Sequence, residues 1–232
     1  MKAIILAGGK GTRLRPLTYK IPKALLPING KTLTEHLFDL LKRHDITDIF
    51  ISIGYLSEKI KKYFKDGKGF GVNIKYLEEN EPLGTAGPLK LAKNELTESF
   101  LVSNGDELKD INLDEMYEQH KKNKALVTIA LTKVSDSSQY GVAKLEGEKI
   151  LEFVEKPKKE DAPSNLINSG LYIIEPEVIE MIPDGFVMLE KAVFPKLAEK
   201  GKLFGYSFPG QWFDTGNMGR YNNALKEWKG LV

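Results

Sequence analysis

The sequence has 232 residues, of which 41% are hydrophobic and 28% are charged, and its formal net charge is +2. These proportions are those of an ordinary globular chain, long enough for one large α/β domain. The small net charge gives no reason to expect nucleic acid or a membrane as a partner, and no apolar run approaches the roughly 18–20 residues of a membrane span. The absence of cysteine excludes a disulfide framework, a thiol nucleophile and a cysteine-based metal site. Since the N-terminal residues lack the layout of a signal peptide, we expect a cytoplasmic protein.

The first part of the chain alternates between strand and helix patterns. We predict strands at residues 2–7, 48–53, 72–77, 99–103 and 125–132, and helices at 32–44, 57–64, 87–93 and 112–122. Ser57 is expected to cap the second helix and Asn112 the fourth, because short polar side chains accept hydrogen bonds from the first turn. The order of elements implies an α/β fold with a mostly parallel, three-layer sheet and right-handed crossovers.

The pattern changes after residue 134. Residues 140–145 and 149–155 predict a hairpin, and further strands are predicted at 166–174 and 203–207, with helices at 176–181, 188–199 and 217–229. No linker rich in proline, glycine or serine interrupts the chain. We therefore predict a single domain over residues 1–232, whose second half adds to the sheet begun by the first.

A loop rich in glycine and basic residues follows the first strand. It runs as Leu6-Ala7-Gly8-Gly9-Lys10-Gly11-Thr12-Arg13, and continues through three prolines to residue 31. Glycines let the backbone approach a ligand closely, and successive free N–H groups in such a loop form a concave site for anions. Arg13 and Lys23 add positive charge. The loop therefore indicates a phosphate-bearing ligand at the carboxyl edge of the sheet.

Two familiar phosphate motifs do not fit this loop. A dinucleotide fingerprint would begin at Gly9, but Leu14 occupies the position of its third glycine, which is needed for close packing of helix on strand. Gly30-Lys31-Thr32 resembles the end of a P-loop, but Leu25 stands where the first glycine would be. Both a dinucleotide-binding fingerprint and a P-loop are therefore disfavoured.

Two carboxylates follow predicted strand ends and are candidates for a metal site. Asp106 lies in Asn104-Gly105-Asp106, and Asp214 lies in Asp214-Thr215-Gly216. Mg²⁺ prefers a pair of carboxylates together with substrate phosphates, because it keeps several waters and rarely receives an all-protein cage. Taken alone, each segment is better explained as a turn that has no chemical role. The three histidines are expected to be on the surface or half-buried, and we assign them no chemistry.

Two further segments admit a functional and a structural explanation. Glu155-Lys156-Pro157 places an acceptor beside a cation, which suits a ligand with hydroxyls and a phosphate, but taken alone it is better explained as a surface charge pair before a proline that ends the strand. Gly84-Thr85-Ala86 allows close backbone approach to a ligand, but a structural turn is the simpler account.

Taken together, these segments resemble the sugar-1-phosphate nucleotidylyltransferases, also called nucleotide-sugar pyrophosphorylases. The opening loop followed by Pro22-Lys23-Ala24-Leu25-Leu26-Pro27 resembles the family's signature. Further matches follow in the family's order, at Gly84-Thr85-Ala86, Gly105-Asp106, Tyr140-Gly141-Val142, Val154-Glu155-Lys156-Pro157, Asn168-Ser169-Gly170 and Asp214-Thr215-Gly216. The resemblance implies a three-layer Rossmann-like nucleotidyltransferase fold with an added β-rich sugar-binding region. Residues 1–133 would then be the nucleotide-binding half and residues 134–232 the sugar-phosphate-binding half.

The resemblance also implies a reaction and a role for each matching residue. The family joins a sugar 1-phosphate to a nucleoside triphosphate and releases pyrophosphate. Arg13, Lys23 and Lys156 would be catalytic and grip the phosphates, while Asp106 and Asp214 would hold Mg²⁺. The nucleotide would be bound at Leu6, Gly8, Gly9, Gly11, Thr12, Glu79, Gly84 and Thr85, and the sugar at Gly141, Glu155 and Asn168. We also expect a homodimer.

The nucleotide is predicted from the position that reads the base. Counting back from Gly84, Glu79 occupies the place where pyrimidine-using relatives carry Gln. An ionised Glu only accepts hydrogen bonds, which suits the N1–H and N2–H₂ edge of guanine. The register leaves Glu78 and Glu81 open as alternatives. Residues 76–89 also resemble the mannose-1-phosphate guanylyltransferases, so we expect GTP and mannose 1-phosphate.

Other functions remain open at this point. Within the family they are a glucose-1-phosphate uridylyl- or thymidylyltransferase and a heptose-1-phosphate guanylyltransferase. From a different class, an inactive nucleotide-sugar-binding regulatory subunit would share the fold, although the joint presence of Arg13, Lys23, Asp106, Lys156 and Asp214 speaks against it. A nicotinamide-dependent dehydrogenase is disfavoured by Leu14.

Overall fold

The computed structural model describes all residues from 1 to 232, and the chain divides into two compact units. The first unit comprises Met1–Pro82, Ser103–Ile111 and Gly210–Val232, and the second comprises Leu83–Val102 and Asn112–Pro209. Each unit mixes helices with strands, so the predicted α/β class is confirmed. None of the helices has the length and the apolar composition that crossing a membrane requires.

The first unit contains a small parallel sheet, β5-β4-β1. Its strands are β1 (Ala3–Leu6), β4 (Asp48–Ile53), β5 (Asn73–Glu78), and the short β2 (Pro27–Ile28), β3 (Lys31–Thr32), β7 (Glu107–Lys109) and β13 (Trp212–Asp214). Its helices are α1 (Leu33–Arg43), α2 (Ser57–Phe64) and α7 (Met218–Glu227), with 3-10 turns at Thr12–Leu14, Leu17–Tyr19, Lys23–Leu25 and Lys68–Phe70. The predicted strand at 48–53 is confirmed residue for residue.

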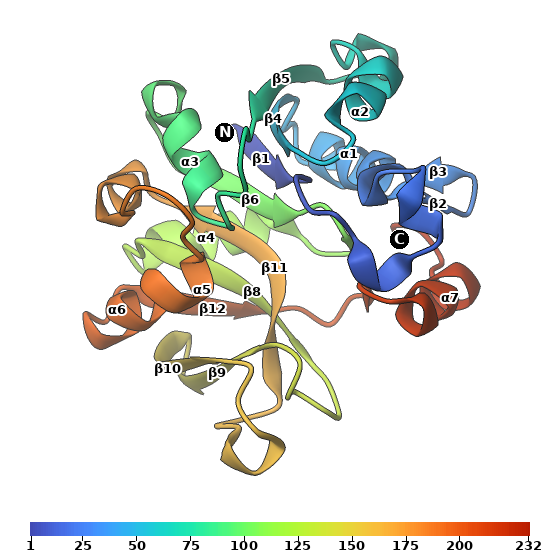
Figure 1. Ribbon diagram of the computed structural model, residues 1–232. Coiled ribbons are helices and arrows are strands. Elements are labelled where there is room, and N and C mark those ends of the chain that lie inside the picture. The colour runs from blue at the N-terminus through green and yellow to red at the C-terminus, as the bar shows by residue number, and fades with distance from the viewer. The chain divides into compact units, whose positions relative to one another are not determined.

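The region predicted as a long loop, residues 8–31, is ordered by its apolar side chains. Leu14, Leu26 and Ile28 are buried in one cluster with Tyr221 and Trp228 near the C-terminus. Its end also forms a tight hairpin of β2 and β3, where Asn29 and Gly30 both have positive φ. In Figure 1 this hairpin lies beside the C-terminal segment, and the Asn29 side chain donates to the carbonyl oxygen of Trp228 at 2.8 Å.

The second unit has the strand order β6-β11-β8-β12-β10-β9. Its strands are β6 (Phe100–Asn104, which ends in the first unit), β8 (Val127–Lys133), β9 (Gly141–Glu146), β10 (Lys149–Glu155), β11 (Leu166–Ile174) and β12 (Leu203–Ser207). Its helices are α3 (Gly87–Leu91), α4 (Leu113–Lys122), α5 (Leu189–Ala192) and α6 (Phe194–Glu199), with 3-10 turns at Lys93–Glu95, Lys159–Asp161 and Pro176–Met181. The β9–β10 hairpin, drawn in yellow in Figure 1, is confirmed.

Strand directions differ between the units. In the first unit β1 with β4 and β4 with β5 are parallel. In the second unit β12 with β8 is parallel, whereas β11 with β8, β12 with β10 and β10 with β9 are antiparallel. A parallel connection needs a long crossover, but hairpins and short returns place neighbouring strands antiparallel. The three-layer arrangement, the sugar-binding region and the division of roles at residue 133 stay predictions.

Three local predictions are wrong. Ser57 is the first helical residue of α2, and Leu56 precedes it with a left-handed backbone and no capping side chain. The predicted helix at 188–199 is two short helices, because Pro195 starts a new one in α6. His36 and His120 are buried rather than exposed or half-buried, since each ring finds hydrogen-bond partners in the interior.

Candidate active site

The glycine loop begins where β1 ends, and Glu79 lies against its first glycine. A Cβ at Gly8 would overlap Oε1 of Glu79, so the carboxylate occupies the space that any larger residue would need. Ser52, at the carboxyl end of β4, donates its hydroxyl to the same oxygen at 2.5 Å. By contrast, Glu78 forms an exposed ion pair with Lys61, and Glu81 is exposed. Of the three candidates, Glu79 is therefore the one that faces the glycine loop.

The rest of the loop is ordered by a local hydrogen bond and is exposed on one side. Gly11 has φ 59°, and its carbonyl oxygen accepts from the hydroxyl of Thr18 at 2.8 Å. A Cβ at Gly9 would meet nothing within 4 Å, and Thr12 and Arg13 are exposed. The backbone of the loop between Leu6 and Lys23 is thus accessible to a ligand.

Asp106 and Asp214 lie on neighbouring chain segments although 107 residues separate them in the sequence. The antiparallel pair of β7 and β13 puts Asp214 opposite Glu107. The buried Thr215 then donates both its amide, at 3.2 Å, and its hydroxyl, at 2.7 Å, to the carbonyl oxygen of Asp106. The two carboxylates are brought together by a short ladder that sequence reading missed, because both strands have only three residues.

Each of these carboxylates has a cationic partner. Lys23 forms an ion pair with Asp106, and Arg220 of α7 forms one with Asp214. Burial alone would raise the pKa of the Asp106 carboxyl, but the positive charges of Lys23, Lys109 and Arg13 hold that pKa below its ordinary value. Arg13 also lies near Gly216, because a Cβ there would be 3.3 Å from its guanidinium. The predicted residues Arg13, Lys23, Asp106 and Asp214 therefore form one charged cluster.

Buried polar groups next to Asp106 form hydrogen bonds and an ion pair with each other. Lys109 is fully buried, and its ammonium lies 3.6 Å from a carboxylate oxygen of Glu107. Glu107 also accepts from the indole N–H of Trp212 at 2.9 Å and from the Asn104 amide at 3.0 Å. Burial raises the pKa of Glu107 to about 7 and lowers that of Lys109. These contacts fix the backbone on both sides of Asp106.

The second unit groups the predicted sugar-contact residues. In the hairpin Gly141 pairs with Glu155, and a Cβ on Gly141 would lie 2.9 Å from Oε2 of Glu155. Lys156 has φ 50°, and its ammonium lies 3.2 Å from Oε1 of Glu155. The structural explanation, a charge pair at a strand end, therefore describes the contact between Glu155 and Lys156, and their roles toward a ligand stay predictions.

Asn168 belongs to a chain of hydrogen bonds that ends at Thr85. Asn168 donates to the hydroxyl of Tyr172 at 2.9 Å, and Tyr172 donates to Glu190 at 3.3 Å. Thr85 donates to the other oxygen of Glu190 at 2.6 Å and accepts from the amide of Leu189 at 2.8 Å. Burial raises the pKa of Glu190 above its ordinary value. Gly84, with φ 76°, approaches the backbone of Val187, so this segment also serves as a structural turn.

The donor set for a metal ion consists of two carboxylates. No group of three or more His, Cys, Asp and Glu residues is placed to hold a metal ion. Asp106 and Asp214 alone would leave most coordination positions to water and phosphate oxygens, which is the arrangement that Mg²⁺ tolerates best. The side chains present therefore fit a magnesium ion delivered with a phosphate ligand.

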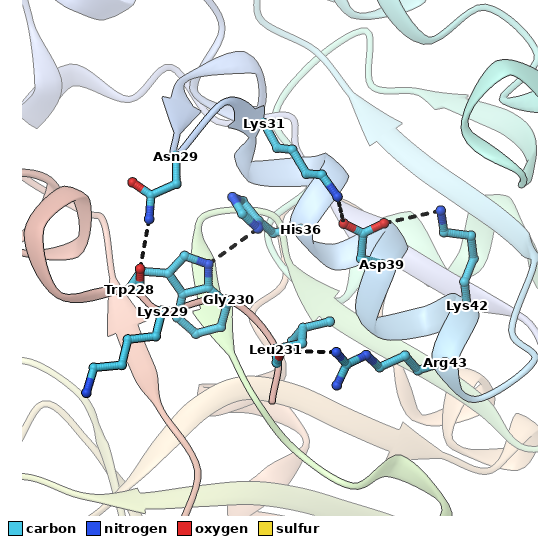
Figure 2. Close-up of a pocket in the computed structure, with 10 residues that line it drawn as sticks. All are labelled: Asn29, Lys31, His36, Asp39, Lys42, Arg43, Trp228, Lys229, Gly230 and Leu231. Carbon is cyan, nitrogen blue, oxygen red and sulfur yellow. Dashed lines mark hydrogen bonds and ion pairs between the residues drawn. The ribbon is translucent and has the colours of Figure 1, made fainter.

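A separate pocket of about 650 Å³ contains none of the predicted site residues. Figure 2 shows Asp39 between Lys31, at 2.5 Å, and Lys42, at 3.2 Å, while Arg43 donates to the carbonyl oxygen of Leu231 at 3.0 Å. The side chains of Lys31, Asp39 and Lys42 are paired with each other, and that of Arg43 with the backbone. The hydrogen bond from Arg43 therefore holds the C-terminal segment against α1.

Sequence reading missed several side chains that contact predicted site residues, among them Ser52, Thr215, Glu190 and Arg220. In Asp214-Thr215-Gly216 the sequence pattern indicates only the carboxylate as a candidate ligand. Ser52, Glu190 and Arg220 carried no local signal, because each acts on a residue that another element supplies.

The fold and the charged cluster define the class of this protein. In the first unit the glycine loop follows a parallel strand, and the two carboxylates form ion pairs with Lys23 and Arg220. The family model described as "Nucleotidyl transferase" matches residues 2–229, and the chain belongs to this family.

Relatives with curated names are similar over most of this chain. The mannose-1-phosphate guanyltransferase beta-B of Xenopus laevis is 42% identical over 222 residues, which cover 93% of this chain and 61% of the relative. The UTP–glucose-1-phosphate uridylyltransferase of Synechocystis sp. is 39% identical over 243 residues, which cover 97% of this chain and 63% of the relative. The chain thus spans about three fifths of the length of these relatives.

A solved structure extends the likeness to three dimensions. A UDP-glucose pyrophosphorylase complexed with UDP-glucose has a TM-score of 0.85 to this chain at 26% identity, covering 98% of this chain and 97% of the other. The mixed α/β fold with a central sheet is therefore shared with a sugar-1-phosphate nucleotidyltransferase.

Proposed function

We propose that the chain is a mannose-1-phosphate guanylyltransferase, which joins mannose 1-phosphate to the guanylyl group of GTP and releases pyrophosphate. The observation that carries this proposal is the charged cluster of Arg13, Lys23, Asp106 and Asp214 beside an open glycine loop. The family membership and the Xenopus laevis relative support it.

In this reaction a phosphate oxygen of the sugar 1-phosphate attacks the α-phosphorus of the nucleotide. A new P–O bond forms there, and the bond from the α-phosphorus to the pyrophosphate oxygen breaks. The nucleophile is already an anion, so no general base is needed. The task is to bring two polyanions together and to stabilise the charge that develops on the phosphoryl oxygens. That need explains a site with Arg and Lys and without a histidine or serine nucleophile.

The first unit supplies the groups for the nucleotide in this proposal. The loop from Gly8 to Thr12 binds phosphates through its backbone, Arg13 clamps the triphosphate, and Lys23 stabilises the α-phosphate. A guanidinium suits this role because it donates in a planar fork. Mg²⁺ bound by Asp106 and Asp214 would supply positive charge to the triphosphate when present.

The second unit supplies the groups for the sugar 1-phosphate. Lys156 binds its phosphate, while Glu155, Gly141 and Asn168 contact its hydroxyls. The carboxylate and the amide of these side chains are acceptors and donors for hydroxyl groups. Gly84 and Thr85 remain proposed nucleotide contacts.

The choice of guanine rests on Glu79. Its carboxylate lies over the glycine loop, whereas Glu78 and Glu81 face solvent. A carboxylate accepts two hydrogen bonds from the N1–H and N2–H₂ groups of guanine.

The proposal also includes the predicted cytoplasmic location and the predicted homodimer.

A second candidate is favoured by the Synechocystis relative, which is almost as similar and whose name specifies UTP and glucose 1-phosphate. A grid of GTP, UTP, dTTP, ATP and CTP against mannose, glucose and heptose 1-phosphates, read as pyrophosphate release with Mg²⁺, separates the two. The proposal expects the highest kcat/KM with GTP and mannose 1-phosphate. Highest turnover with UTP and glucose 1-phosphate would favour the second candidate, and no turnover with any pair would favour a regulatory role.

A further inference from the structure

Ser52 is a polar residue at the end of an apolar strand. Strand β4 reads Ile49-Phe50-Ile51-Ser52-Ile53 after its first residue, and Ser52 is fully buried in it. Its neighbours in register are Leu6 of β1 and Leu77 of β5. A buried hydroxyl is unfavourable unless it is hydrogen-bonded. A serine in this place therefore calls for a partner.

That partner is the proposed base-reading carboxylate. The Ser52 hydroxyl donates to Oε1 of Glu79 at 2.5 Å, which is a charge-assisted hydrogen bond. The backbone of Glu79 is anchored to the same strand, since its amide donates to the carbonyl oxygen of Ile53 at 2.8 Å. The side chain and the main chain of Glu79 are thus both held by the last two residues of β4.

The glycines around the carboxylate make room for it beside the loop. A Cβ at Gly8 would overlap Oε1 of Glu79, and a Cβ at Gly54 would lie 3.2 Å from the carbonyl oxygen of Gly8. The amide of Tyr55 donates to that carbonyl at 3.2 Å, which fixes the loop against β4. The hydrogen bond from Ser52 therefore holds Oε1 of Glu79 next to a loop backbone that is itself fixed against β4.

We propose that Ser52 is a specificity-determining positioning residue, which holds Glu79 in the orientation that accepts from the N1–H and N2–H₂ edge of guanine. This inference rests on the proposed function. Without the hydroxyl, the carboxylate would rotate about its terminal torsions, and the two hydrogen bonds to the base would no longer form together. The residue acts on nucleotide selection and not on phosphoryl transfer.

The test compares GTP with ITP, which lacks the N2 amino group. In the wild type, kcat/KM for GTP should exceed that for ITP by about tenfold or more, the scale of one base-reading hydrogen bond. Ser52→Ala should raise KM for GTP about tenfold, as expected for the loss of a hydrogen bond to a charged group, while changing KM for ITP and kcat much less. The ratio of the two kcat/KM values should therefore fall toward one.

A double variant shows whether Ser52 acts through Glu79. Glu79→Gln should produce the same loss of discrimination, and Ser52→Ala added to it should change little further. Additive losses would mean that Ser52 acts independently of Glu79, which overturns the inference. The matched control is Ser99→Ala, since Ser99 is also a buried serine that donates to a carboxylate, Glu175, at 2.8 Å. It should keep the wild-type ratio of GTP to ITP.

The outcomes separate this inference from the proposed function. If the wild type uses GTP and Ser52→Ala keeps the wild-type ratio, the inference fails alone. A uniform fall in kcat with both nucleotides would show a structural role only and would also overturn it. If the wild type does not use GTP, the proposed function and the inference fail together.

Discussion

Asp106 in the first unit and Glu190 in the second are both acids that contact predicted site residues, but their surroundings differ in kind. Asp106 faces the ammonium of Lys23, and positive charges lower its pKa. Glu190 is enclosed by the neutral donors Thr85 and Tyr172, and burial raises its pKa. One acid is kept charged and the other is driven toward the neutral form.

This difference matches the two kinds of ligand in the proposed reaction. Phosphates and a divalent cation require fixed charges of both signs, which the first unit places on β7, β13 and the glycine loop. Sugar hydroxyls require directional hydrogen bonds, and the second unit orients Asn168 through a chain of them. The contrast predicts that charge removal damages the first unit's chemistry, whereas loss of a hydroxyl damages the second unit's stability.

The largest effect is expected from the cations of the first unit. Arg13→Ala and Lys23→Ala should each lower kcat at least about 100-fold, the scale of losing one preorganised charge contact to the reacting phosphate. Lys31→Ala is the control, because Lys31 pairs with Asp39 in the separate pocket. Steady-state pyrophosphate release measures all three. Near-normal turnover in either site variant would remove that residue from the mechanism.

In the second unit the critical group is a neutral hydroxyl. Thr85→Val removes the donor to Glu190 and the acceptor for the Leu189 amide, both part-buried. Leaving such groups unpaired should lower the free energy of unfolding by about 2 kcal/mol. Thr85→Ser keeps both hydrogen bonds and should recover most of this loss. Urea denaturation measures both, and equal stabilities of the two variants would show that the hydroxyl is dispensable.

The spacing between the two carboxylates depends on Thr215. Thr215→Val removes the hydroxyl that donates to the carbonyl oxygen of Asp106. Groups that orient metal ligands change metal affinity by about 10-fold or more, so the Mg²⁺ concentration for half-maximal rate should rise about tenfold. Binding of Mn²⁺ in the presence of GTP, followed by electron paramagnetic resonance, gives a readout other than activity.

Thr34→Val is the matched control for this change. Thr34 is equally buried, and it donates to the carbonyl oxygen of Ala24 at 3.1 Å. It should leave the metal requirement at the wild-type value. A similar rise in both variants would assign the effect to general destabilisation.

Much of the fold was predictable because its signals are local. Alternation and turn residues gave β11 and the β9–β10 hairpin, and helical spacing gave α1 with bounds one residue from those observed. The β2–β3 hairpin had a signal that was not used, the dipeptide Asn29-Gly30, whose two residues adopt the positive φ that such turns require.

The arrangement of the candidate site was predictable only in part. The glycine loop, Lys23 and the two aspartates stand out by residue type, and the structure brings Lys23 and Asp106 into contact. The β7–β13 ladder was not predictable, since three-residue strands give no periodicity and over 100 residues separate them. The buried positions of Glu190 and His120 were not predictable either, because the residues that hydrogen-bond to them come from other elements.

The smallest effect concerns pH, and here the two acids should respond with opposite sign. The pKa of Glu190 lies above its ordinary 4.5, so the folded chain keeps a proton that the unfolded chain releases, and stability is lost as the pH rises above 4.5. The pKa of Asp106 lies below its ordinary 3.8, so the stability it contributes is present above pH 3.8 and is lost as the pH falls below it.

Comparing each acid with its amide isolates these contributions. The stability of the wild type relative to Glu190→Gln should begin to decline as the pH rises above 4.5, by at most about 1.4 kcal/mol per pH unit for one proton. Relative to Asp106→Asn it should stay level at those pH values and decline only below about pH 4. Urea unfolding at a series of pH values measures both differences. Parallel curves for the two pairs would mean that the charged and the neutral surroundings do not distinguish these acids, and the contrast between the units would no longer hold.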